Sequence, residues 1–309
     1  MKVIIFGASS FIGKNLIKAL HNKYKLKLVM ADSRYCADIF SEIEEKNIHI
    51  IETKFMPSIN FDAILEEKDM VIHLASSTNP TTSNKNISDE IFANVLTSAK
   101  LFDSCVRKKV KKVIFISSGG TVYGKGVKCP ITENAQTNPI NSYGLQKLSI
   151  EKMLYVYNQS FNLDYNILRL SNPYGPYQRP NGQLGVITTF LYNAIHNMDI
   201  HVYGDGSVIR DFLYIDDAVR VIKLIMENEC KHRIYNIGSG YGTSINDIVQ
   251  VIKNEMSGKL TVKYGQMRTV DVPENFLNVN RFENEFGTIS LVSLADGISL
   301  TRHFLEDNG

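Results

Sequence analysis

Hydrophobic residues along the chain alternate between short unbroken runs and longer stretches with helical spacing. The first run, Val3–Phe6, ends at Gly7, and between Phe11 and Leu20 apolar residues recur three and four positions apart. Unbroken runs of this length are typical of strands buried on both faces, and the second spacing is typical of an amphipathic helix. The N-terminus therefore predicts a strand, a tight turn and a helix.

The same alternation continues to residue 170. Further strands are predicted at Leu26–Ala31, Ile48–Ile51, Met70–Ala75, Val113–Ser117 and Tyr165–Leu170, and long helices at Asp89–Lys108 and Ser142–Asn158. Strands and helices that alternate in this way form a parallel sheet with helices on both faces. We therefore predict an α/β fold built on a Rossmann-type, doubly wound parallel sheet.

The region after residue 171 has a different pattern. Three prolines, Pro173, Pro176 and Pro180, interrupt it, and short elements separated by glycine-containing turns follow. We expect residues 1–171, with returning segments at about 211–236, to form the first lobe. Residues 172–309 would mainly form a smaller α/β C-terminal lobe.

Composition and charge fit a globular protein without a polyanionic partner. Of 309 residues, 44% are hydrophobic and 21% are charged, and the net charge is +2. These values are ordinary for a globular protein. The densest basic run, from Arg107 to Lys112, is best explained as a helix C-terminus that leads into a strand, because cations stabilise that end of the helix dipole. We therefore expect no nucleic-acid partner.

The cysteines and the apolar segments indicate the cellular compartment and argue against a zinc site or a membrane span. The chain has four widely separated cysteines without a CxxC spacing: Cys36, Cys105, Cys129 and Cys230. Isolated thiols are more typical of a reducing compartment than of a disulfide framework or a zinc site. No apolar run is long enough to span a membrane, and the N-terminal run is too short for a signal peptide. We expect a cytoplasmic protein without a metal site or a membrane partner.

The turn after the first strand carries the sequence Gly7-Ala-Ser-Ser-Phe-Ile-Gly13. In dinucleotide-binding folds the first glycine allows a tight turn, the last allows close packing of strand and helix, and the helix N-terminus faces the pyrophosphate. Ser10 stands where a further glycine commonly allows close approach of the backbone. A tight turn without a ligand is the alternative interpretation.

Asp32 follows the second predicted strand and supports the dinucleotide interpretation. A carboxylate at this point can accept hydrogen bonds from both adenosine ribose hydroxyls, and it would repel the 2′-phosphate of NADP. We therefore expect NAD as the cofactor. Two alternatives stay open: Asp32 could cap a turn or helix, and the nearby Arg34 could favour NADP.

Tyr143 and Lys147 form the candidate catalytic pair. They stand in the sequence Tyr-Gly-Leu-Gln-Lys, a spacing that places both on one face of the predicted helix. A nearby ammonium favours the ionised form of a phenol, so we expect a lowered pKa for Tyr143. The tyrosinate could then act as a general base toward a substrate hydroxyl. This spacing often arises by chance, and its position after the fifth strand and after the glycine motif gives it weight.

The motifs stand in the order found in a known enzyme family. They are the glycine motif, Val71-Ile-His-Leu-Ala75, Phe115-Ile-Ser-Ser-Gly-Gly-Thr-Val-Tyr-Gly124, Tyr143 with Lys147, Arg169-Leu-Ser-Asn-Pro-Tyr-Gly-Pro176 and Arg210-Asp-Phe-Leu-Tyr-Ile-Asp-Asp217. Over nearly its whole length the chain resembles the extended short-chain dehydrogenase/reductases. Within them it resembles the NAD-dependent nucleotide-sugar epimerases and dehydratases, in particular the UDP-glucose (UDP-galactose) 4-epimerases.

The resemblance implies that the first lobe binds NAD and the C-terminal lobe binds a nucleotide sugar, with a UDP-sugar favoured. Tyr143 would take the proton of the sugar 4-hydroxyl while hydride passes to NAD. The 4-keto sugar would then rotate and take the hydride back on its other face. The residues expected to bind NAD are Gly7, Ser10, Phe11, Ile12, Gly13, Asp32, Ser33, Phe55, Leu74, Ala75, Asn94, Ser117, Tyr143, Lys147 and Pro173.

Four residues are expected to contact the substrate: Asn172, Tyr203, Arg210 and Arg268. The family pattern places Asn172 against the diphosphate. It gives the two arginines the role of clamps, and a planar guanidinium can bind phosphate oxygens in a bidentate manner. For either arginine alone, a surface salt bridge is an equally good interpretation.

One catalytic position departs from the family pattern. The family's catalytic Ser or Thr falls at Gly119, so the bridging hydroxyl must come from Ser118, Thr121 or water. We favour Thr121, because Ser117 and Ser118 can satisfy local backbone groups instead. The related 4,6-dehydratases carry an Asp-Glu pair where this chain has Gly120 and Thr121, so we do not expect dehydration.

Three functions therefore stay open. The first is 4-epimerisation, and the second is NAD(P)H-dependent 4-ketoreduction, which uses the same tyrosine, lysine and cofactor site. The third is a non-catalytic, NAD-sensing protein. It is supported by Gly119 and by Lys54, which stands where an aspartate usually contacts adenine and leaves that contact to the backbone at Phe55. An intact Tyr143 and Lys147 argue against it.

Two predicted helices carry wider apolar surfaces than one sheet contact requires. The residues are Leu145, Leu148, Ile150, Met153, Leu154, Val156 and Tyr157 on the later helix, and Leu96, Ala99, Leu101 and Phe102 on the earlier one. Extended loops could cover these surfaces. The family resemblance favours a two-fold homodimer in which the two helices pair with their mates.

Overall fold

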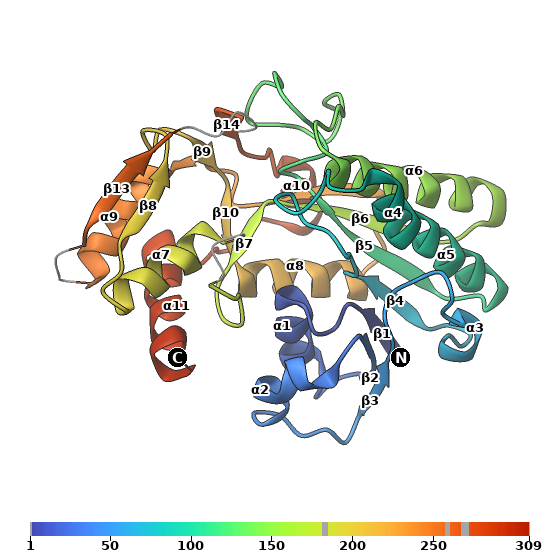
Figure 1. Cartoon of the computed structure of the whole chain (residues 1–309). Coiled ribbons are helices and arrows are strands. Elements are labelled where there is room, and N and C mark those ends of the chain that lie inside the picture. Colours follow the sequence, from blue (N-terminus) through green and yellow to red (C-terminus); the bar gives the residue numbers. More distant parts are fainter. Residues whose placement is uncertain (1, 181–184, 257–259, 267–271, 309) are drawn as a thin grey trace.

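The computed structural model describes residues 2–180, 185–256, 260–266 and 272–308, and Figure 1 shows the arrangement of their elements. A seven-stranded sheet in the order β11-β6-β5-β4-β1-β2-β3 forms the centre. Every neighbouring pair of its strands is parallel. The strands are β1 (Lys2–Phe6), β2 (Lys25–Met30), β3 (Ile48–Glu52), β4 (Met70–His73), β5 (Lys112–Ser118), β6 (Tyr165–Leu170) and β11 (Ile234–Ile237). The predicted doubly wound α/β fold is confirmed.

Helices cover both faces of this sheet. On one face α1 (Phe11–Leu20) and α8 (Ile215–Glu227) pack together, and on the other α5 (Thr97–Arg107) packs with α6 (Ser142–Phe161). The unbroken apolar run of β1 serves both sides: Val3 and Ile5 belong to the core under α1, and Ile4 and Phe6 to the core under α5. A strand with two buried faces cannot alternate polar and apolar residues, which explains its sequence.

The helix expected at Asp89–Lys108 is divided. The chain forms α4 (Ile87–Ile91), then a π-helical turn (Phe92–Leu96), and only then α5. A π-turn inserts one residue into the helical ladder and redirects the side chains beyond it. Here it accompanies Asn94, whose Oδ1 accepts a hydrogen bond of 2.8 Å from the backbone N–H of Ser77. The predicted long helix is therefore present from Ile87 to Arg107, and the π-turn inside it is a feature that the sequence did not reveal.

The remaining elements are short. In the first half they are the 3₁₀ helix η1 (Ser33–Cys36), α2 (Ala37–Phe40) and α3 (Phe61–Ile64). After β6 they are β7 (Asn172–Tyr174), α7 (Val186–Ile195), β8 (Ile200–Tyr203), β9 (Ile209–Arg210), β10 (Phe212–Tyr214), β12 (Thr243–Ser244), α9 (Ile245–Met256), β13 (Val262–Gly265), β14 (Glu274–Asn275), α10 (Asn280–Phe286) and α11 (Leu294–Asn308). The strands among them form small sheets: β10 with β7, β12-β9-β14, and β13 with β8.

The chain returns to the central sheet after building part of the C-terminal region. β10 pairs with β7 at the carboxyl end of β6, α8 covers the sheet beside α1, and β11 adds the outermost strand next to β6. In Figure 1 the elements α7, α9, β8 and β13 lie together at one side of the central sheet. The loops between these elements and the carboxyl ends of the central strands enclose the cavity described next.

Candidate functional site

A cavity of about 910 Å³ lies at the carboxyl ends of the central strands. Ser10 after β1, Leu74 after β4 and Ser118 at the end of β5 line one side of it. Val202 and Arg210 line it from the C-terminal region. In doubly wound sheets, ligands bind outside the carboxyl ends of the strands where the strand order reverses, and β1 lies between β4 and β2 at this point.

The glycine loop brings backbone close to backbone. A Cβ at Gly7, whose φ is +84°, would lie 2.8 Å from the backbone nitrogen of Ala75. A Cβ at Gly13 would lie 2.3 Å from the carbonyl oxygen of Ala8. Ser10 caps α1, since its Oγ accepts a hydrogen bond of 3.2 Å from the N–H of Gly13. The serine that departs from the glycine pattern therefore has a structural role as a helix cap.

Eight of the residues predicted to bind NAD line the cavity: Ser10, Phe11, Ile12, Leu74, Ser117, Tyr143, Lys147 and Pro173. Gly7, Gly13 and Ala75 make the close backbone contacts of the glycine loop. A loop that no side chain can enter and that leads into a helix N-terminus fits a dinucleotide pyrophosphate. Asp32, Ser33, Phe55 and Asn94 lie outside the described lining of the cavity.

Asp32 caps η1 at the end of β2. Its Oδ1 accepts a hydrogen bond of 2.9 Å from the backbone N–H of Arg34, and its two oxygens bind the Arg34 guanidinium at 2.6–3.0 Å. These hydrogen bonds hold the pKa of Asp32 below its ordinary value. The Arg34 side chain is 88% exposed, so the ion pair is weak and opens easily. Asp32 thus caps η1, as the alternative interpretation expected. Its carboxylate also lies at the end of β2, where the family pattern expects the adenosine ribose.

Phe55 and Asn94 are packed into the protein. The ring of Phe55 lies 5.1 Å from that of His73 and 6.1 Å from that of Phe6. The side chain of Asn94 bonds Ser77 and Gln146 and is only 2% exposed. In this structure both side chains stabilise the segments around the cavity rather than facing it.

Tyr143 and Lys147 lie in the first turns of α6. Asn141 caps this helix by accepting a hydrogen bond of 2.8 Å from the N–H of Gly144. Lys147 Nζ lies 5.7 Å from the ring centroid of Tyr143 and donates a hydrogen bond of 2.8 Å to the carbonyl oxygen of Ile116. The sequence spacing therefore does bring the phenol and the ammonium to one face of the helix, at the wall of the cavity.

The expected effect of Lys147 on the pKa of Tyr143 is wrong for this structure. Burial raises the pKa of Tyr143 to about 12. Burial also lowers the pKa of Lys147 to about 8, against the opposing charge of Glu151. The ammonium sits beside the ring and is held by a carbonyl oxygen, so the cost of desolvating the phenolate exceeds its attraction to the ammonium.

Leu277 explains the glycine at the departing catalytic position. A Cβ at Gly119 would lie 2.5 Å from Leu277 Cδ1 and 3.1 Å from the carbonyl oxygen of Arg169. Leu277 follows β14 and is fully buried, and its N–H donates a hydrogen bond of 3.1 Å to Asp211 Oδ2. An apolar side chain from the C-terminal region thus fills the space that a serine or threonine side chain would need.

Ser118 and Thr121 both stay candidates for the replacement hydroxyl. Both line the cavity, and neither hydroxyl makes a hydrogen bond within the described part of the chain. The Oγ1 of Thr121 is buried, whereas Ser118 is half-buried and its hydroxyl is the more accessible of the two. Ser117 already has a partner, because its Oγ donates a hydrogen bond of 2.5 Å to the buried Glu151. The preference for Thr121 therefore stays a prediction, with Ser118 as its alternative.

Three of the four residues expected to contact the substrate line the cavity: Asn172, Tyr203 and Arg210. The Asn172 amide donates a hydrogen bond of 2.8 Å to the carbonyl oxygen of Asp211. The Arg210 guanidinium donates to the carbonyl oxygens of Ile209 and Val272 at 2.8 and 2.7 Å. Arg268 lies outside the described residues.

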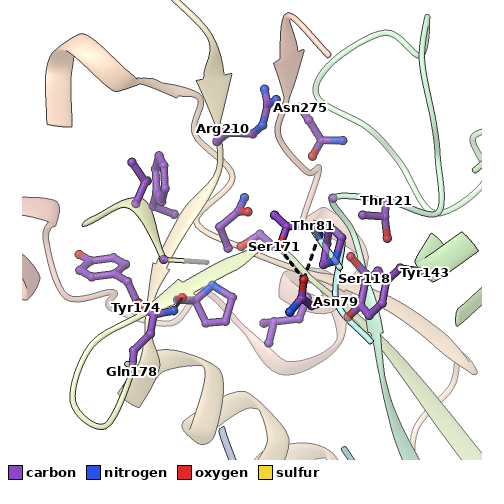
Figure 2. Close-up of a pocket in the computed structure, with 18 of the residues that line it drawn as sticks. Asn79, Thr81, Ser118, Thr121, Tyr143, Ser171, Tyr174, Gln178, Arg210 and Asn275 are labelled. Carbon is purple, nitrogen blue, oxygen red and sulfur yellow. Dashed lines mark hydrogen bonds between the residues drawn. The ribbon is translucent and has the colours of Figure 1, made fainter. Parts of the chain in front are cut away.

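Several cavity residues escaped the sequence analysis. They include Thr78, Asn79, Thr81, Asn84 and Asn275. Figure 2 shows Asn79 on the same side of the cavity as Ser118 and Tyr143, with Tyr174 and Gln178 on the other. The polar run directly after β4 is the signal that could have revealed the first four, since the carboxyl ends of parallel strands face the ligand.

Two classes of site find no support in the part of the chain that is described. No group of histidine, cysteine and acidic side chains there is arranged to hold a metal ion. Across the same residues, none of the helices has the length and apolarity needed to traverse a lipid bilayer.

Comparison with known proteins agrees with the geometry. Residues 3–238 match the model of the NAD dependent epimerase/dehydratase family. The chain belongs to this family. It is therefore an NAD-dependent enzyme of the extended short-chain dehydrogenase/reductase type, which acts on nucleotide sugars.

Two curated relatives of this family member differ in their reaction. A putative UDP-glucose 4-epimerase of Methanocaldococcus jannaschii is 30% identical over 99% of both chains. A dTDP-4-dehydro-6-deoxyglucose reductase of Escherichia coli is 31% identical over 96% of this chain and 95% of the relative. Among solved structures, the UDP-glucose 4-epimerase of Thermotoga maritima with UDP-glucose has a TM-score of 0.91 at 30% identity, covering 100% of this chain and 99% of its own.

Proposed function

We propose that this family member inverts the configuration at C4 of a UDP-hexose through a transient 4-keto sugar. The observation that carries the proposal is the position of Tyr143 and Lys147 at the wall of one cavity that reaches both the glycine loop and Arg210. That cavity has room for a cofactor at one end and a nucleotide sugar at the other. The relatives that act on UDP-glucose support the same assignment.

The residues divide the chemistry among them. Tyr143 takes the proton of the sugar 4-hydroxyl as general base and returns it when the hydroxyl reforms. Lys147, held by the Ile116 carbonyl, stabilises the phenolate. Ser118, whose hydroxyl is the more accessible of the two candidates, supplies the hydroxyl that connects phenol and substrate. Bound NAD would supply the hydride acceptor and, in its oxidised form, a positive charge that further favours the phenolate. Asn172, Arg210 and Arg268 would hold the diphosphate.

The second candidate is 4-ketoreduction of a nucleotide sugar, favoured by the reductase relative of Escherichia coli. The same tyrosine and lysine would then donate a proton to a 4-keto sugar rather than remove one. An epimerase keeps its cofactor through each cycle, whereas a reductase must exchange it. Freshly purified epimerase should release about one nicotinamide cofactor per chain on denaturation, and a reductase should release much less.

The decisive experiment is incubation with UDP-glucose and UDP-galactose, followed by NMR of the anomeric protons. We expect each to be converted into the other without added cofactor. Tyr143→Phe should lose about 10³-fold or more in rate while its melting temperature stays unchanged. A wild-type enzyme that converts neither sugar, or a Tyr143→Phe variant of full activity, would contradict the proposal.

We further propose that the enzyme is a homodimer. Eight large apolar side chains are exposed on α4, the following π-turn and α6: Ile87, Ile91, Phe92, Leu96, Leu145, Tyr155, Val156 and Phe161. Leu101, Phe102, Ile150 and Leu154, which the sequence assigned to the same surface, are buried in the enzyme's own core. A light-scattering mass of 34.9 kDa at micromolar concentration would contradict the dimer. The cytoplasmic location stays a prediction.

A further inference from the structure

The loop from Ser76 to Asn84, between β4 and α4, forms a polar wall of the cavity. Thr78, Asn79, Thr81 and Asn84 of this loop all line it. Ser118 and Tyr143 line the same cavity, and Figure 2 shows Asn79 on their side of it. No role in binding or catalysis follows for this loop from the motifs of the chain.

The orientation of the Asn79 amide is fixed by its own turn. Its Oδ1 accepts hydrogen bonds from the backbone N–H groups of Thr81 and Thr82, at 2.9 and 3.0 Å, and from Thr81 Oγ1 at 2.7 Å. Backbone N–H groups can only donate, so the atom that accepts from them must be the oxygen. The dashed lines in Figure 2 end on this atom.

The other end of the same amide is therefore a donor. Nδ2 of Asn79 makes no hydrogen bond within the described residues, and the side chain is half-buried at the cavity wall. An amide NH₂ at a partly buried site gains free energy when it finds an acceptor, because leaving it unpaired costs about 1–3 kcal/mol. An oxygen of a ligand in the cavity beside Tyr143 would supply this acceptor.

Gln146 fixes the loop to the catalytic helix. Its Oε1 accepts hydrogen bonds from Asn94 Nδ2 at 2.6 Å and Thr78 Oγ1 at 3.2 Å. Its Nε2 donates to Glu90 Oε2 at 3.0 Å and to Ser142 Oγ at 2.8 Å. Gln146 is 2% exposed and lies between Tyr143 and Lys147 in the sequence. The position of Asn79 is thus tied to the helix that carries the catalytic pair.

We propose that Asn79 is a substrate-binding residue whose amide NH₂ donates a hydrogen bond to an oxygen on the hexose ring. The inference rests on the proposed function, because that function places a hexose beside Tyr143. The ligand group is a hydroxyl or carbonyl oxygen of the sugar. The proposed function places the nucleotide toward Arg210, so the sugar and not the nucleotide is the expected partner of this donor.

Asn79→Asp tests the donor of this amide most directly. It keeps the oxygen that accepts from Thr81 and Thr82, so the turn is preserved, and it replaces the donor by a second acceptor. We expect UDP-glucose to bind about 10- to 100-fold more weakly by calorimetry, with a matching rise in KM. Binding of UDP, which lacks the sugar, should change less than twofold.

Asn60→Asp is the matched control. Asn60 also accepts a backbone hydrogen bond through Oδ1, from Ala63, but it is exposed and lies far from the cavity lining. This variant should bind both ligands like the wild type. Asn79→Ser also retains an oxygen that can form the turn. It serves as a second variant if the charge introduced by aspartate lowers the melting temperature. It too should weaken UDP-glucose binding and leave UDP binding unchanged.

Deoxy analogues locate the acceptor. Among the UDP-2-, UDP-3- and UDP-6-deoxyglucoses, we expect one analogue to bind wild type and Asn79→Asp equally, because it lacks the oxygen that Asn79 contacts. The proposal is overturned if Asn79→Asp and Asn79→Ser bind UDP-glucose as the wild type does. A wild-type enzyme that binds UDP-glucose no better than it binds UDP, and converts neither UDP-hexose, would instead contradict the proposed function itself.

Discussion

The two halves of the cavity are built from different parts of the chain. In the cofactor half the wall is backbone: Gly7 and Gly13 approach Ala75 and Ala8 so closely that no Cβ fits. In the substrate half the wall is made largely of side chains on loops, and at Gly120 it leaves open space, because a Cβ there would meet only Ser118 Oγ at 3.9 Å. The glycine loop therefore tolerates no side chain at Gly7 or Gly13, whereas the loop at Gly120 has room for one.

The largest effect should come from a methyl group in the backbone wall. We expect Gly13→Ala to cost about 3 kcal/mol or more in the free energy of unfolding, because its Cβ would lie 2.3 Å from a carbonyl oxygen, and to abolish NAD binding. Gly120→Ala is the control and should stay within about 0.5 kcal/mol. Urea unfolding and calorimetry measure both. If Gly13→Ala and Gly120→Ala lost the same free energy of unfolding, the two halves of the cavity would not differ in their tolerance of a side chain.

Removing the hydroxyl groups of the substrate half one at a time shows which of them takes part in catalysis. We expect Ser118→Ala to lower kcat by about 10²-fold without a change in stability, since it removes a group that acts in proton transfer. Thr121→Val should change kcat less than threefold, because its Oγ1 is buried without a partner. Steady-state rates with a UDP-hexose check both. If Thr121→Val lowered kcat more than Ser118→Ala does, Thr121 and not Ser118 would supply the catalytic hydroxyl.

A smaller effect is expected where the two halves meet. Gly119→Ser restores the hydroxyl position of the family but brings its Cβ to 2.5 Å from Leu277 Cδ1, so it should cost about 2 kcal/mol of stability. Adding Leu277→Ala should recover part of this loss, because the two changes share one space. A double-mutant cycle in urea measures the coupling. Purely additive losses would mean that Leu277 does not occupy this space.

Over a single pH unit, the pH dependence gives the smallest effect, up to about tenfold in kcat/KM. Tyr143 must lose its proton, and burial raises its pKa to about 12. Lys147 must keep its proton, and burial lowers its pKa to about 8. kcat/KM should therefore rise with pH between 6 and 8 and flatten above about 8, where Lys147 begins to lose its proton. The positive charge of bound oxidised NAD would shift this rise in kcat/KM to lower pH, and kcat/KM would still rise with pH. A rate that falls with pH in this range would contradict the assignment of Tyr143 as the base.

The backbone wall is also the part that the sequence predicts best. Strand β1, helix α1 and the glycines between them follow from hydrophobic pattern and steric need alone. The spacing of Tyr143 and Lys147 likewise predicts their common face. Each of these features depends on residues that are close together in the chain.

The features that escaped prediction depend on residues far apart. The need for glycine at position 119 depends on Leu277, which the sequence gives no reason to place beside it. The pKa of Tyr143 depends on burial by several segments, and the π-turn at Asn94 depends on a bond to Ser77. The direction of the Asn79 amide is set within its own loop, but the loop's position is set by Gln146 on another element.

Strand β11 limits how hybrids of this enzyme can be assembled. Its residue Tyr235 pairs with Leu168 of β6, so the outermost strand of the first half is encoded after much of the C-terminal region. Joining one parent up to residue 171 to another parent's remainder would place a foreign strand at the edge of the sheet. To transfer substrate preference between relatives, two donor pieces would have to be inserted on either side of a retained segment that runs from β10 to β11.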